Sequence, residues 1–447
     1  MGPTERLSQF VVETRAKDIP SQAMGIAKLV ILDALGVILA GSRQPAARII
    51  TEYVRELGGA PRARVIGANV WTAPPLAALA NGTMAFILDY DDNLHGSIHT
   101  LPAALALGEE LRISGEQLLE VYILGREICH RLDTAIDAGR SQNLGGPTSR
   151  GWFAGGTTGS LAAAATAGKV LGLELKQMQM AFGIAASTAG GLRRNFGTMA
   201  KAFQGGSAAR NGVTAALLAE KGFTADKAIL EEPFGLINAL CLEGECNWDA
   251  MTDSLGKAYY MERLPSIKAY PTCAPSHRPI EGILALRRRY GFGHEDVESI
   301  ECDFHTRSLC RVDPQEGMAG HNSMPFILAV ALLEGKVVVE QFTDDKVSDP
   351  LVRAVMSKVK HIPLAREKGE SESPDRLTVK LKDGTAHSIE VAERRTLTTE
   401  QEIEAKYMEC ATMVLNADDA KRLHDMILHL DTLEDVSVLM QIVSGPG

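Results

Sequence analysis

The sequence has few aromatic residues and no cysteine pattern that is typical of a metal site. Aromatic residues make up 5% of the 447 positions, and the seven cysteines include no Cys-x-x-Cys pair. An odd number of scattered cysteines argues against a disulfide framework and against structural zinc. It is typical instead of a reduced, cytoplasmic protein.

A surplus of basic residues is also missing. The chain carries 46 Lys and Arg against 56 Asp and Glu, which gives a formal net charge of -10 and a pI near 5.6. Nucleic-acid binding needs a basic surface, so we expect no nucleic-acid partner. A local basic pocket can still bind an anionic substrate in an acidic protein.

An N-terminal stretch that combines a charged start with an uninterrupted apolar core is absent. The apolar run around Leu29–Leu32 is interrupted by Asp33, so the sequence predicts neither a signal peptide nor a membrane span. No His-Glu-x-x-His motif, P-loop, Gly-x-Gly-x-x-Gly after a strand or Gly-x-Ser-x-Gly elbow occurs. We therefore expect no metal and no bound cofactor.

The sequence does contain a long series of helical segments. From Thr4 to about residue 240, apolar residues recur at helical spacing between short Gly, Pro or Ser interruptions. Ile19-Pro20-Ser21 predicts a helix start, whereas Gly36 and Gly41-Ser42 predict breaks. The Ala-rich stretch 160–168 has few large side chains, so we expect a neighbouring helix or chain to approach it closely.

The pattern changes near residue 265. Ile300, Cys302 and Phe304 alternate with polar residues as in a strand, and two alternating runs flank the turn Asp383-Gly384. Helices are expected over 276–290 and 323–333 and again from Thr399 onward. The prediction is a mainly α fold, in which a large all-helical domain accompanies a smaller α+β domain, residues 266–395, with a short antiparallel sheet.

Residues 88–102 concentrate groups that exchange protons. This segment contains Asp89, Asp91, Asp92, His95 and His99 directly after an Ala-rich helical run. The Asp residues of such a segment can simply cap a helix or lie on a polar loop. Carboxylates beside imidazoles are equally typical of general acid–base catalysis.

Two further motifs carry a family resemblance. Gly151-Trp152-Phe153 precedes a Gly- and Ala-rich helix, and Lys268-Ala269-Tyr270-Pro271-Thr272-Cys273 is followed by Ser276-His277-Arg278-Pro279. Together with residues 88–102 they resemble the MmgE/PrpD family, which includes 2-methylcitrate dehydratase, cis-aconitate decarboxylase and iminodisuccinate epimerase. The resemblance runs from 31–36 to 323–325 and the hairpin beyond. It implies that the C-terminal segment packs back on the first domain, giving a helical domain of residues 1–265 with 396–447.

The resemblance implies which residues act. Asp89, His99, Lys201 and Lys268 fall at active-site positions of the family, so Lys268 or His99 is expected as the base, with Asp89 orienting His99. Lys201 and Lys268 are expected to anchor substrate carboxylates, and Tyr270 is a candidate proton donor. A lysine that is desolvated between other cations has a lowered pKa, which would allow Lys268 to act as a base.

Other residues are expected around the same pocket, and each has a simpler alternative. His95, Cys273, His277 and Phe153 are expected to contact substrate, although Cys273 can be a buried structural thiol and His277 a capping imidazole. The supplementary candidates are Arg193, Arg194, Arg210, His321 and Ser323.

Phe153 departs from the family pattern. In the Gly-Trp-His pattern of dehydratase and decarboxylase relatives the third residue is an active-site histidine, and a phenyl ring cannot carry a proton. Another group must therefore supply the acid, or the reaction differs from theirs.

These observations predict a cofactor-independent enzyme that removes a proton α to a carboxylate of a small di- or tricarboxylate. A dehydratase-type hydro-lyase is the first interpretation, because the resemblance supplies a base and cations that hold carboxylates. The alternatives are an iminodisuccinate-like epimerase, a cis-aconitate-type decarboxylase and a non-catalytic binding relative. We also expect a homodimer formed through the helical domain.

Overall fold

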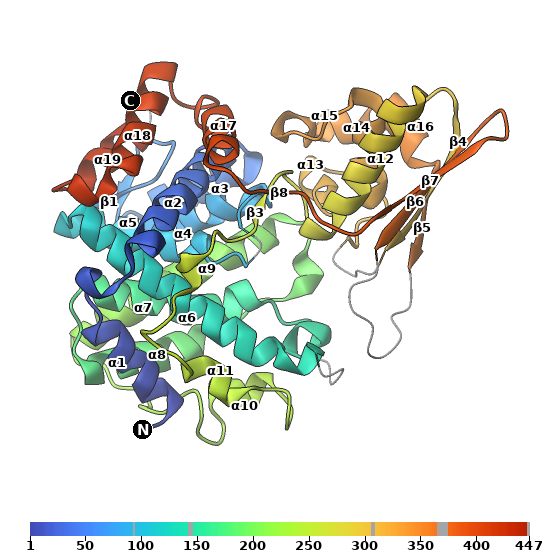
Figure 1. Cartoon of the computed structure of the whole chain (residues 1–447). Helices are drawn as coiled ribbons and strands as arrows, with labels where there is room; N and C mark the ends of the chain where they lie inside the picture. The colour runs from blue at the N-terminus through green and yellow to red at the C-terminus, as the bar shows by residue number, and fades with distance from the viewer. Residues whose placement is uncertain (93, 142–145, 305–308, 364–373, 445–447) are drawn as a thin grey trace.

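The computed structural model describes residues 1–92, 94–141, 146–304, 309–363 and 374–444, and it has two lobes (Figure 1). The larger lobe, here called the helical lobe, contains both described ends of the chain. The other, here called the small lobe, combines helices with a sheet. The predicted mainly α fold with a smaller α+β part is confirmed.

The helical lobe contains helices from both ends of the sequence. They are α1 (Pro3–Glu13), α2 (Ser21–Ser42), α3 (Pro45–Leu57), α4 (Pro74–Ile87), α5 (Ser97–Leu111), α6 (Gly115–Ser141), α7 (Ala154–Val170), α8 (Leu175–Thr188), α9 (Met199–Glu220), α10 (Leu236–Leu240), α11 (Trp248–Thr252), α17 (Glu400–Ala411), α18 (Ala417–Leu428) and α19 (Ser437–Val443). A two-strand pair, β1 (Ala63–Arg64) with β2 (Trp71–Thr72), also lies here, so the lobe is not purely helical.

Helix α2 is the central helix of this lobe. It begins at Ser21 as predicted, but the predicted break at Gly36 is wrong because the helix continues to Ser42. A Cβ at Gly36 would lie 3.2 Å from the Cα of Tyr407, so the glycine allows α17 to approach α2 closely. The expected return of the C-terminal segment onto the first helices is confirmed by this contact.

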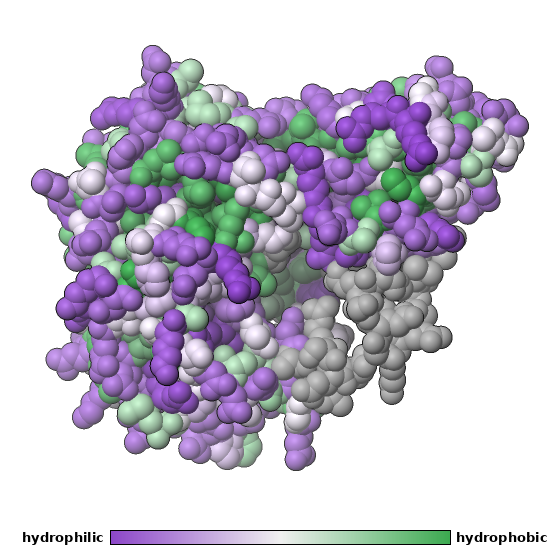
Figure 2. Space-filling view, viewed as in Figure 1, coloured by the Kyte–Doolittle hydropathy of each residue, from purple (hydrophilic) through white to green (hydrophobic). Residues whose placement is uncertain are grey.

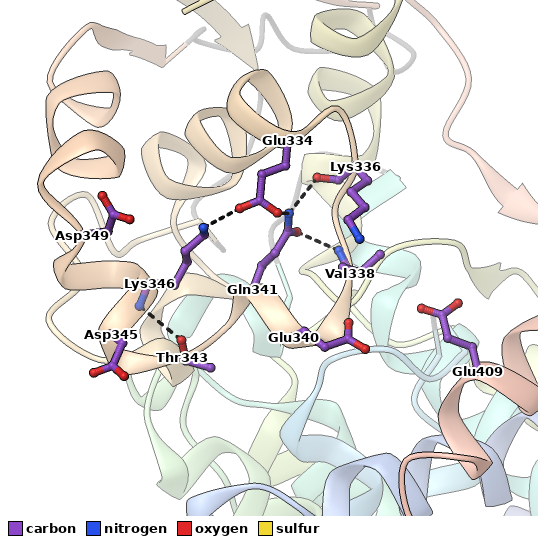
Figure 3. A pocket seen from close by; sticks show the side chains of 10 residues that line it. All are labelled: Glu334, Lys336, Val338, Glu340, Gln341, Thr343, Asp345, Lys346, Asp349 and Glu409. Carbon is purple, nitrogen blue, oxygen red and sulfur yellow. Dashed lines mark hydrogen bonds and ion pairs between the residues drawn. The ribbon is translucent and has the colours of Figure 1, made fainter.

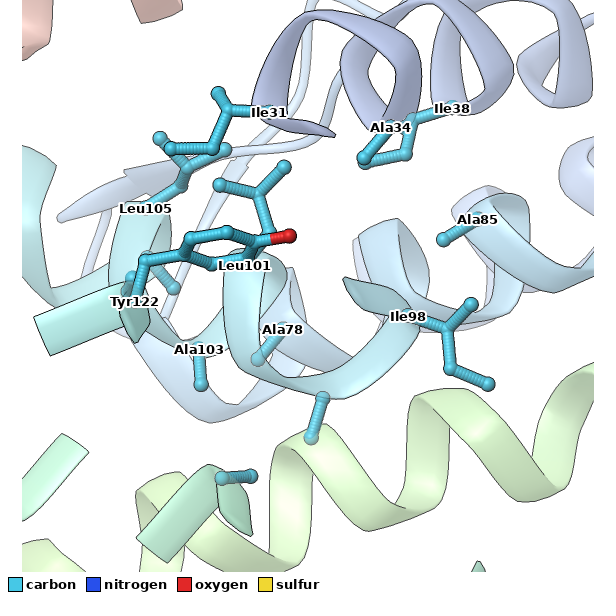
Figure 4. Close-up of a cluster of buried hydrophobic side chains, with 14 of the residues drawn as sticks. Ile31, Ala34, Ile38, Ala78, Ala85, Ile98, Leu101, Ala103, Leu105 and Tyr122 are labelled. Carbon is cyan, nitrogen blue, oxygen red and sulfur yellow. The ribbon is translucent and has the colours of Figure 1, made fainter. Parts of the chain in front are cut away.

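Apolar side chains of α2, α4, α5 and α6 form the core of the lobe (Figure 4). Ile31, Leu101, Leu105 and Tyr122 are completely or almost completely buried there. Helix α2 is long and apolar enough to cross a membrane, but 72% of its most apolar window is buried inside the lobe. It is therefore the core helix of this lobe.

Small residues bring α9 against α4 and α7. A Cβ at Gly206 would collide with the carbonyl of Leu79 on α4, and one at Gly212 would collide with Ala163 on α7. The predicted close approach to the Ala-rich stretch 160–168 is thus made by α9. This packing holds the N-terminal turn of α9, which carries Lys201, beside the end of α4.

The small lobe packs helices against a four-stranded sheet of order β5-β4-β6-β7. Its elements are α12 (His277–Tyr290), β4 (Val297–Phe304), α13 (Gly317–Gly320), α14 (Met324–Glu334), α15 (Asp344–Ser348), α16 (Pro350–Met356), β5 (Val359–Pro363), β6 (Asp375–Leu381) and β7 (Ala386–Val391). The hairpin at Asp383-Gly384 is confirmed, and Gly384 has a φ of +89°. Strands β4, β6 and β7 pair antiparallel as expected, and β5 joins β4 in parallel.

The chain enters and leaves the small lobe through two short strands that lie side by side. Strand β3 (Ile267–Lys268) pairs with β8 (Thr396–Leu397), and Ile267 also forms a bridge with Asp92. Figure 2 shows that the surface is hollowed between the two lobes, near this crossing. The crossing places Lys268 next to the acidic segment that follows α4.

Candidate active site

Asp89 lies between two lysines that come from distant parts of the sequence. It follows α4, is 2% exposed and has a left-handed backbone with φ +50°. Its Oδ2 accepts a hydrogen bond from Lys201 Nζ, and its Oδ1 accepts one from Lys268 Nζ at 2.5 Å. The structure therefore brings together three of the four residues expected at the active site.

The pKa values of Asp89 and Lys268 are set by the charges that each side chain contacts. Burial alone would raise the pKa of Asp89, but Lys201 and Lys268 hold that pKa well below its ordinary value. Burial alone would lower the pKa of Lys268, but Asp89 and Asp91 hold it above its ordinary value. The expected lowered pKa of Lys268 is wrong because its neighbours are carboxylates rather than cations. Lys268 is a charged donor here, not a neutral base.

His95 is a partly exposed acid–base group at this site. Its Nδ1 lies 2.9 Å from Asp91 Oδ2, and 22% of its side chain is exposed, against 3% for Asp91. Its backbone is left-handed, with φ +55°. The ring also packs edge-on against Phe86 at 4.7 Å. Since Nδ1 is engaged by the carboxylate, Nε2 is the nitrogen that can exchange a proton with a bound molecule.

Aromatic rings surround the Lys201 ammonium. Phe153 stacks on Phe86 with centroids 5.5 Å apart and meets Phe196 edge-on at 5.6 Å. Lys201 Nζ lies 4.5 Å from the centre of the Phe86 ring and 5.2 Å from that of Phe196. These cation–π contacts stabilise the ammonium where water is excluded.

His99 lies in a different environment from Asp89. It is fully buried, its Nε2 is 3.5 Å from Cys129 Sγ, and a Cβ at Gly159 would lie 2.8 Å from its ring. Burial and the nearby Arg126 guanidinium lower the pKa of His99 to about 3. The expectation that Asp89 orients His99 is wrong, because His99 Nε2 faces Cys129 Sγ and His99 Nδ1 has no hydrogen-bond partner among the described residues.

Asp92 forms a separate buried ion pair. Arg126 Nη1 and Nη2 lie 2.8 and 3.0 Å from its two carboxylate oxygens, and Ser97 Oγ donates to it at 2.7 Å. Tyr122 Oη lies 2.7 Å from the same Ser97 hydroxyl. This hydrogen-bond network fixes the start of α5. Asp92 accepts from both Arg126 and Ser97, which indicates a structural role for Asp92.

Tyr270 and His277 lie on the small-lobe side. The Tyr270 hydroxyl donates to Glu281, and burial together with that carboxylate raises the pKa of Tyr270. His277 Nδ1 donates to the carbonyl of Arg395 at 3.1 Å, and burial lowers the pKa of His277 to about 4. A tyrosine bound to a carboxylate with a raised pKa is a poor proton donor to a substrate, which disfavours the expected role of Tyr270.

Cys273 and His321 lie beside the lysine pair. Cys273 is 8% exposed, and burial together with the charge of Asp89 raises its pKa to about 11. His321 Nδ1 donates to the carbonyl of Pro271 at 2.6 Å, and burial lowers the pKa of His321 to about 4. Both groups are neutral at pH 7.

The supplementary candidates divide into two groups. Arg193 contacts the site, because its guanidinium lies 5.5 Å from the centre of the Phe196 ring. Arg194 is exposed, Arg210 donates to Asn211 and Ser323 caps α14. Only Arg193 of these arginines lies against the aromatic rings around Lys201.

Asp89, Asp91 and His95 offer ligand atoms within 4.8 Å of one another, an arrangement that a divalent cation can use. Both oxygens of Asp89 already accept from ammonium groups, however, and Lys268 Nζ also lies 3.4 Å from Asp91 Oδ1. A divalent cation there would face two positive charges at hydrogen-bond distance. The three residues therefore fit a metal poorly.

An open pocket of about 520 Å³ lies elsewhere, between α14–α16 and α17 (Figure 3). It contains none of the predicted site residues. Its polar groups bind one another: Gln341 Nε2 donates to Glu334 at 2.7 Å, and Lys346 forms an ion pair with Glu334. These contacts join η6 (Val339–Gln341) to α14 and α15 and indicate a structural role.

Comparison with known proteins identifies the family of this chain. A family model described as the MmgE/PrpD N-terminal domain matches residues 5–249, and one described as the MmgE/PrpD C-terminal domain matches residues 270–432. The chain belongs to the MmgE/PrpD family. The N-terminal match contains Asp89, His95 and Lys201, whereas Lys268 precedes the C-terminal match by two residues.

Several curated relatives span the whole chain. The cis-aconitate decarboxylase of Aspergillus terreus is 29% identical over 480 residues, which cover 100% of this chain and 96% of the relative. The cis-aconitate decarboxylases of mouse and human are 27% and 26% identical, and each comparison covers 99% of this chain. Decarboxylases are lyases, so the relatives support an enzyme of lyase type at the level of the family.

Sequence reasoning missed three parts of this site. Spacing along the chain gave no sign that Phe86 and Phe196 would flank Lys201, or that Asp91 would bind His95. A signal for the third part was present: Asp33 interrupts an apolar helix, and a buried carboxylate needs a partner. That partner is Lys406, whose Nζ lies 2.7 Å from Asp33.

Proposed function

We propose that this MmgE/PrpD protein is a cofactor-independent lyase that decarboxylates a small unsaturated di- or tricarboxylate related to cis-aconitate. The observation that carries the proposal is the Asp91–His95 pair, a partly exposed proton carrier beside the buried lysines. The full-length similarity to cis-aconitate decarboxylases supports the same reaction class.

Lys201 is the proposed anchor for a substrate carboxylate. A lysine ammonium has three donors. Lys268 directs all three to the carboxylate of Asp89, the carbonyl of Asp89 and the carboxylate of Asp91. Lys201 directs one to Asp89 and otherwise faces aromatic rings, so it retains donors for a ligand. Lys268 contributes its charge and holds the two aspartates in place.

The chemistry needs one proton. The bond between a carboxylate carbon and its neighbour breaks, carbon dioxide leaves, and the electron pair is delocalised toward another carboxylate of the unsaturated substrate. The Lys201 and Lys268 charges stabilise this developing anion. His95 Nε2 then delivers one proton to carbon and is reprotonated from solvent, which its 22% exposed side chain permits.

The number of proton transfers that each reaction needs favours decarboxylation over dehydration and epimerisation. Dehydration requires removal of a proton and protonation of the leaving hydroxyl, and epimerisation requires acid–base groups on two faces of one carbon. Among the described histidines of the site, His95 is partly exposed, while His99 and His277 are buried with pKa values near 3 and 4. Tyr270 is also partly exposed, but its hydroxyl donates to Glu281. The hydro-lyase suggested by the sequence is therefore the second choice.

The test is incubation of the purified protein with cis-aconitate, 2-methylcitrate and single stereoisomers of related polycarboxylates in deuterated water. The proposal expects carbon dioxide release and one deuterium in the product. A new ultraviolet-absorbing double bond without carbon dioxide would instead indicate dehydration, and deuterium with inversion would indicate epimerisation. Binding without turnover of any of these compounds would support a non-catalytic relative.

A further inference from the structure

A buried lysine from the C-terminal helix contacts two segments of the candidate site. Lys406 lies on α17, is 4% exposed and forms an ion pair with Asp33 of α2, which is 2% exposed. Charge pairs this deeply buried often add little net stability, because both ions lose their hydration. A stabilising role alone is therefore a weak explanation for Lys406.

The other contacts of Lys406 point to the site. Its Nζ donates to the carbonyl of Tyr90 at 2.6 Å and to the carbonyl of Lys268 at 3.1 Å. It also lies 3.9 Å from the centre of the Tyr90 ring. The ion pair with Asp33, at 2.7 Å, is a third contact of the same ammonium group. Tyr90 lies between Asp89 and Asp91, so both carbonyls belong to segments that carry site residues.

We propose that Lys406 is a positioning residue that fixes the backbone of residue 90 relative to that of residue 268, so that Asp89 and Lys268 meet in the geometry the reaction needs. The activity consequence rests on the proposed function. Asp33 supplies the counter-charge that keeps the ammonium buried, while the two carbonyls define its direction. Lys406 contacts neither of the acid–base side chains, Asp91 and His95, in the described structure.

Three variants separate positioning from simple stabilisation. Asp33→Asn removes the counter-charge but leaves Lys406 as donor to both carbonyls, and it is expected to melt at a lower temperature because the buried ammonium loses its counter-ion. Lys406→Met removes the donors and leaves Asp33 buried without a partner, so it is expected to unfold more readily. The double variant Asp33→Asn with Lys406→Met removes both charges, and a neutral pair of similar volume is expected to keep the fold.

The expected result is that activity follows Lys406 rather than the ion pair. The double variant should melt near the wild-type temperature yet lose on the order of 100-fold in kcat, the scale of a misplacement of about 1 Å. Asp33→Asn should stay within a few fold of wild type. Wild-type kcat in the folded double variant, or equal losses in both Asp33→Asn and the double variant, would overturn the proposal.

Hydrogen exchange tests the same idea without turnover. Amides in peptides covering residues 84–92 and 264–273 should exchange faster in the double variant than in wild type or Asp33→Asn, while α7 and α8 exchange unchanged. Unchanged exchange in both peptides would reject the positioning role. If the wild-type protein decarboxylates nothing, the proposed function fails, but this measurement still decides whether Lys406 holds the two segments.

Discussion

Phe153 stacks on Phe86 at 5.5 Å with ring planes only 7° apart, at the position where the family pattern has a histidine. Phe153 is 5% exposed and also meets Phe196 edge-on. The chain thus has an apolar ring where decarboxylase and dehydratase relatives are expected to have a proton carrier. This relationship explains why His95 is the proton donor of the proposed reaction. The centre of its ring lies 6.1 Å from that of Phe153.

Restoring the family histidine at residue 153 is expected to destabilise the protein. Phe153→His would bury imidazole nitrogens among aromatic rings, which costs about 1–3 kcal/mol for an unpaired polar group. Urea unfolding at pH 8, where the imidazole is neutral, measures the loss. Phe153→Leu, which keeps the site apolar, is the matched control. Equal stability of the histidine variant and wild type would show that burying the imidazole nitrogens at residue 153 carries no cost.

The two histidines of the acidic segment are expected to differ in catalysis. His95→Gln should lower kcat by about two to four orders of magnitude, the usual scale for a lost acid or base, with its melting temperature unchanged. His99→Gln is the control on the same segment, and it should mainly change stability because His99 is completely buried. A large loss of kcat in His99→Gln alongside an active His95→Gln would transfer the role to His99.

Asp89 is expected to give the protein an acid-sensitive stability. The pKa of Asp89 in the folded protein lies well below its ordinary value. Asp89 therefore contributes to the free energy of unfolding above about pH 4, and this contribution is lost as the pH falls toward the folded pKa. At pH 7, Asp89→Asn should cost about 3–5 kcal/mol, because two buried ammonium groups lose a counter-ion. The difference in free energy of unfolding between wild type and Asp89→Asn should become smaller below pH 4, as measured by denaturant unfolding at several pH values. A difference that stays constant down to pH 2 would contradict this assignment.

Chelation is expected to leave turnover unchanged. The ligand atoms of Asp89, Asp91 and His95 lie close together, but the lysines occupy the Asp89 oxygens. Assays before and after EDTA dialysis provide the measurement. Activity that disappears with EDTA and returns with one particular metal would replace the lysine-centred scheme with a metal-centred one.

A homodimer is expected in solution. The helical lobe exposes Ile49, Tyr53 and Leu57 at successive four-residue steps on one face of α3, with exposed fractions of 61%, 45% and 54%. Light scattering at micromolar concentration should give twice the chain mass of 48.0 kDa. A mass equal to that of the single chain would reject the dimer.

Local patterns predicted most of the fold. Helical spacing indicated the helices, and alternation indicated β4 and the β6–β7 hairpin, because both periods reflect which side chains are buried. The parallel strand β5 was missed. Gly36 was misread as a helix break, because its role is contact with Tyr407, which lies 371 positions later in the sequence.

The site was predicted less completely than the fold. Family resemblance named Asp89, Lys201 and Lys268, and the structure brings them together. The spacing of residues along the sequence could not indicate which charged side chains would pair. The pKa of Lys268 depends on that pairing. The expected pairing of Asp89 with His99 rested on the family resemblance and on their proximity in the sequence, and neither indicates which side chains meet in the fold.

The contacts of Lys406 also bear on how the protein is made. The site needs Asp89 from the first quarter of the chain, Lys201 and Lys268 from the middle, and Lys406 from the last tenth. A nascent chain on the ribosome therefore cannot assemble the complete site until α17 has emerged. A fragment ending before α17 would lack Lys406 even if its helices had folded, so the segments around Tyr90 and Lys268 are expected to stay unfixed in it.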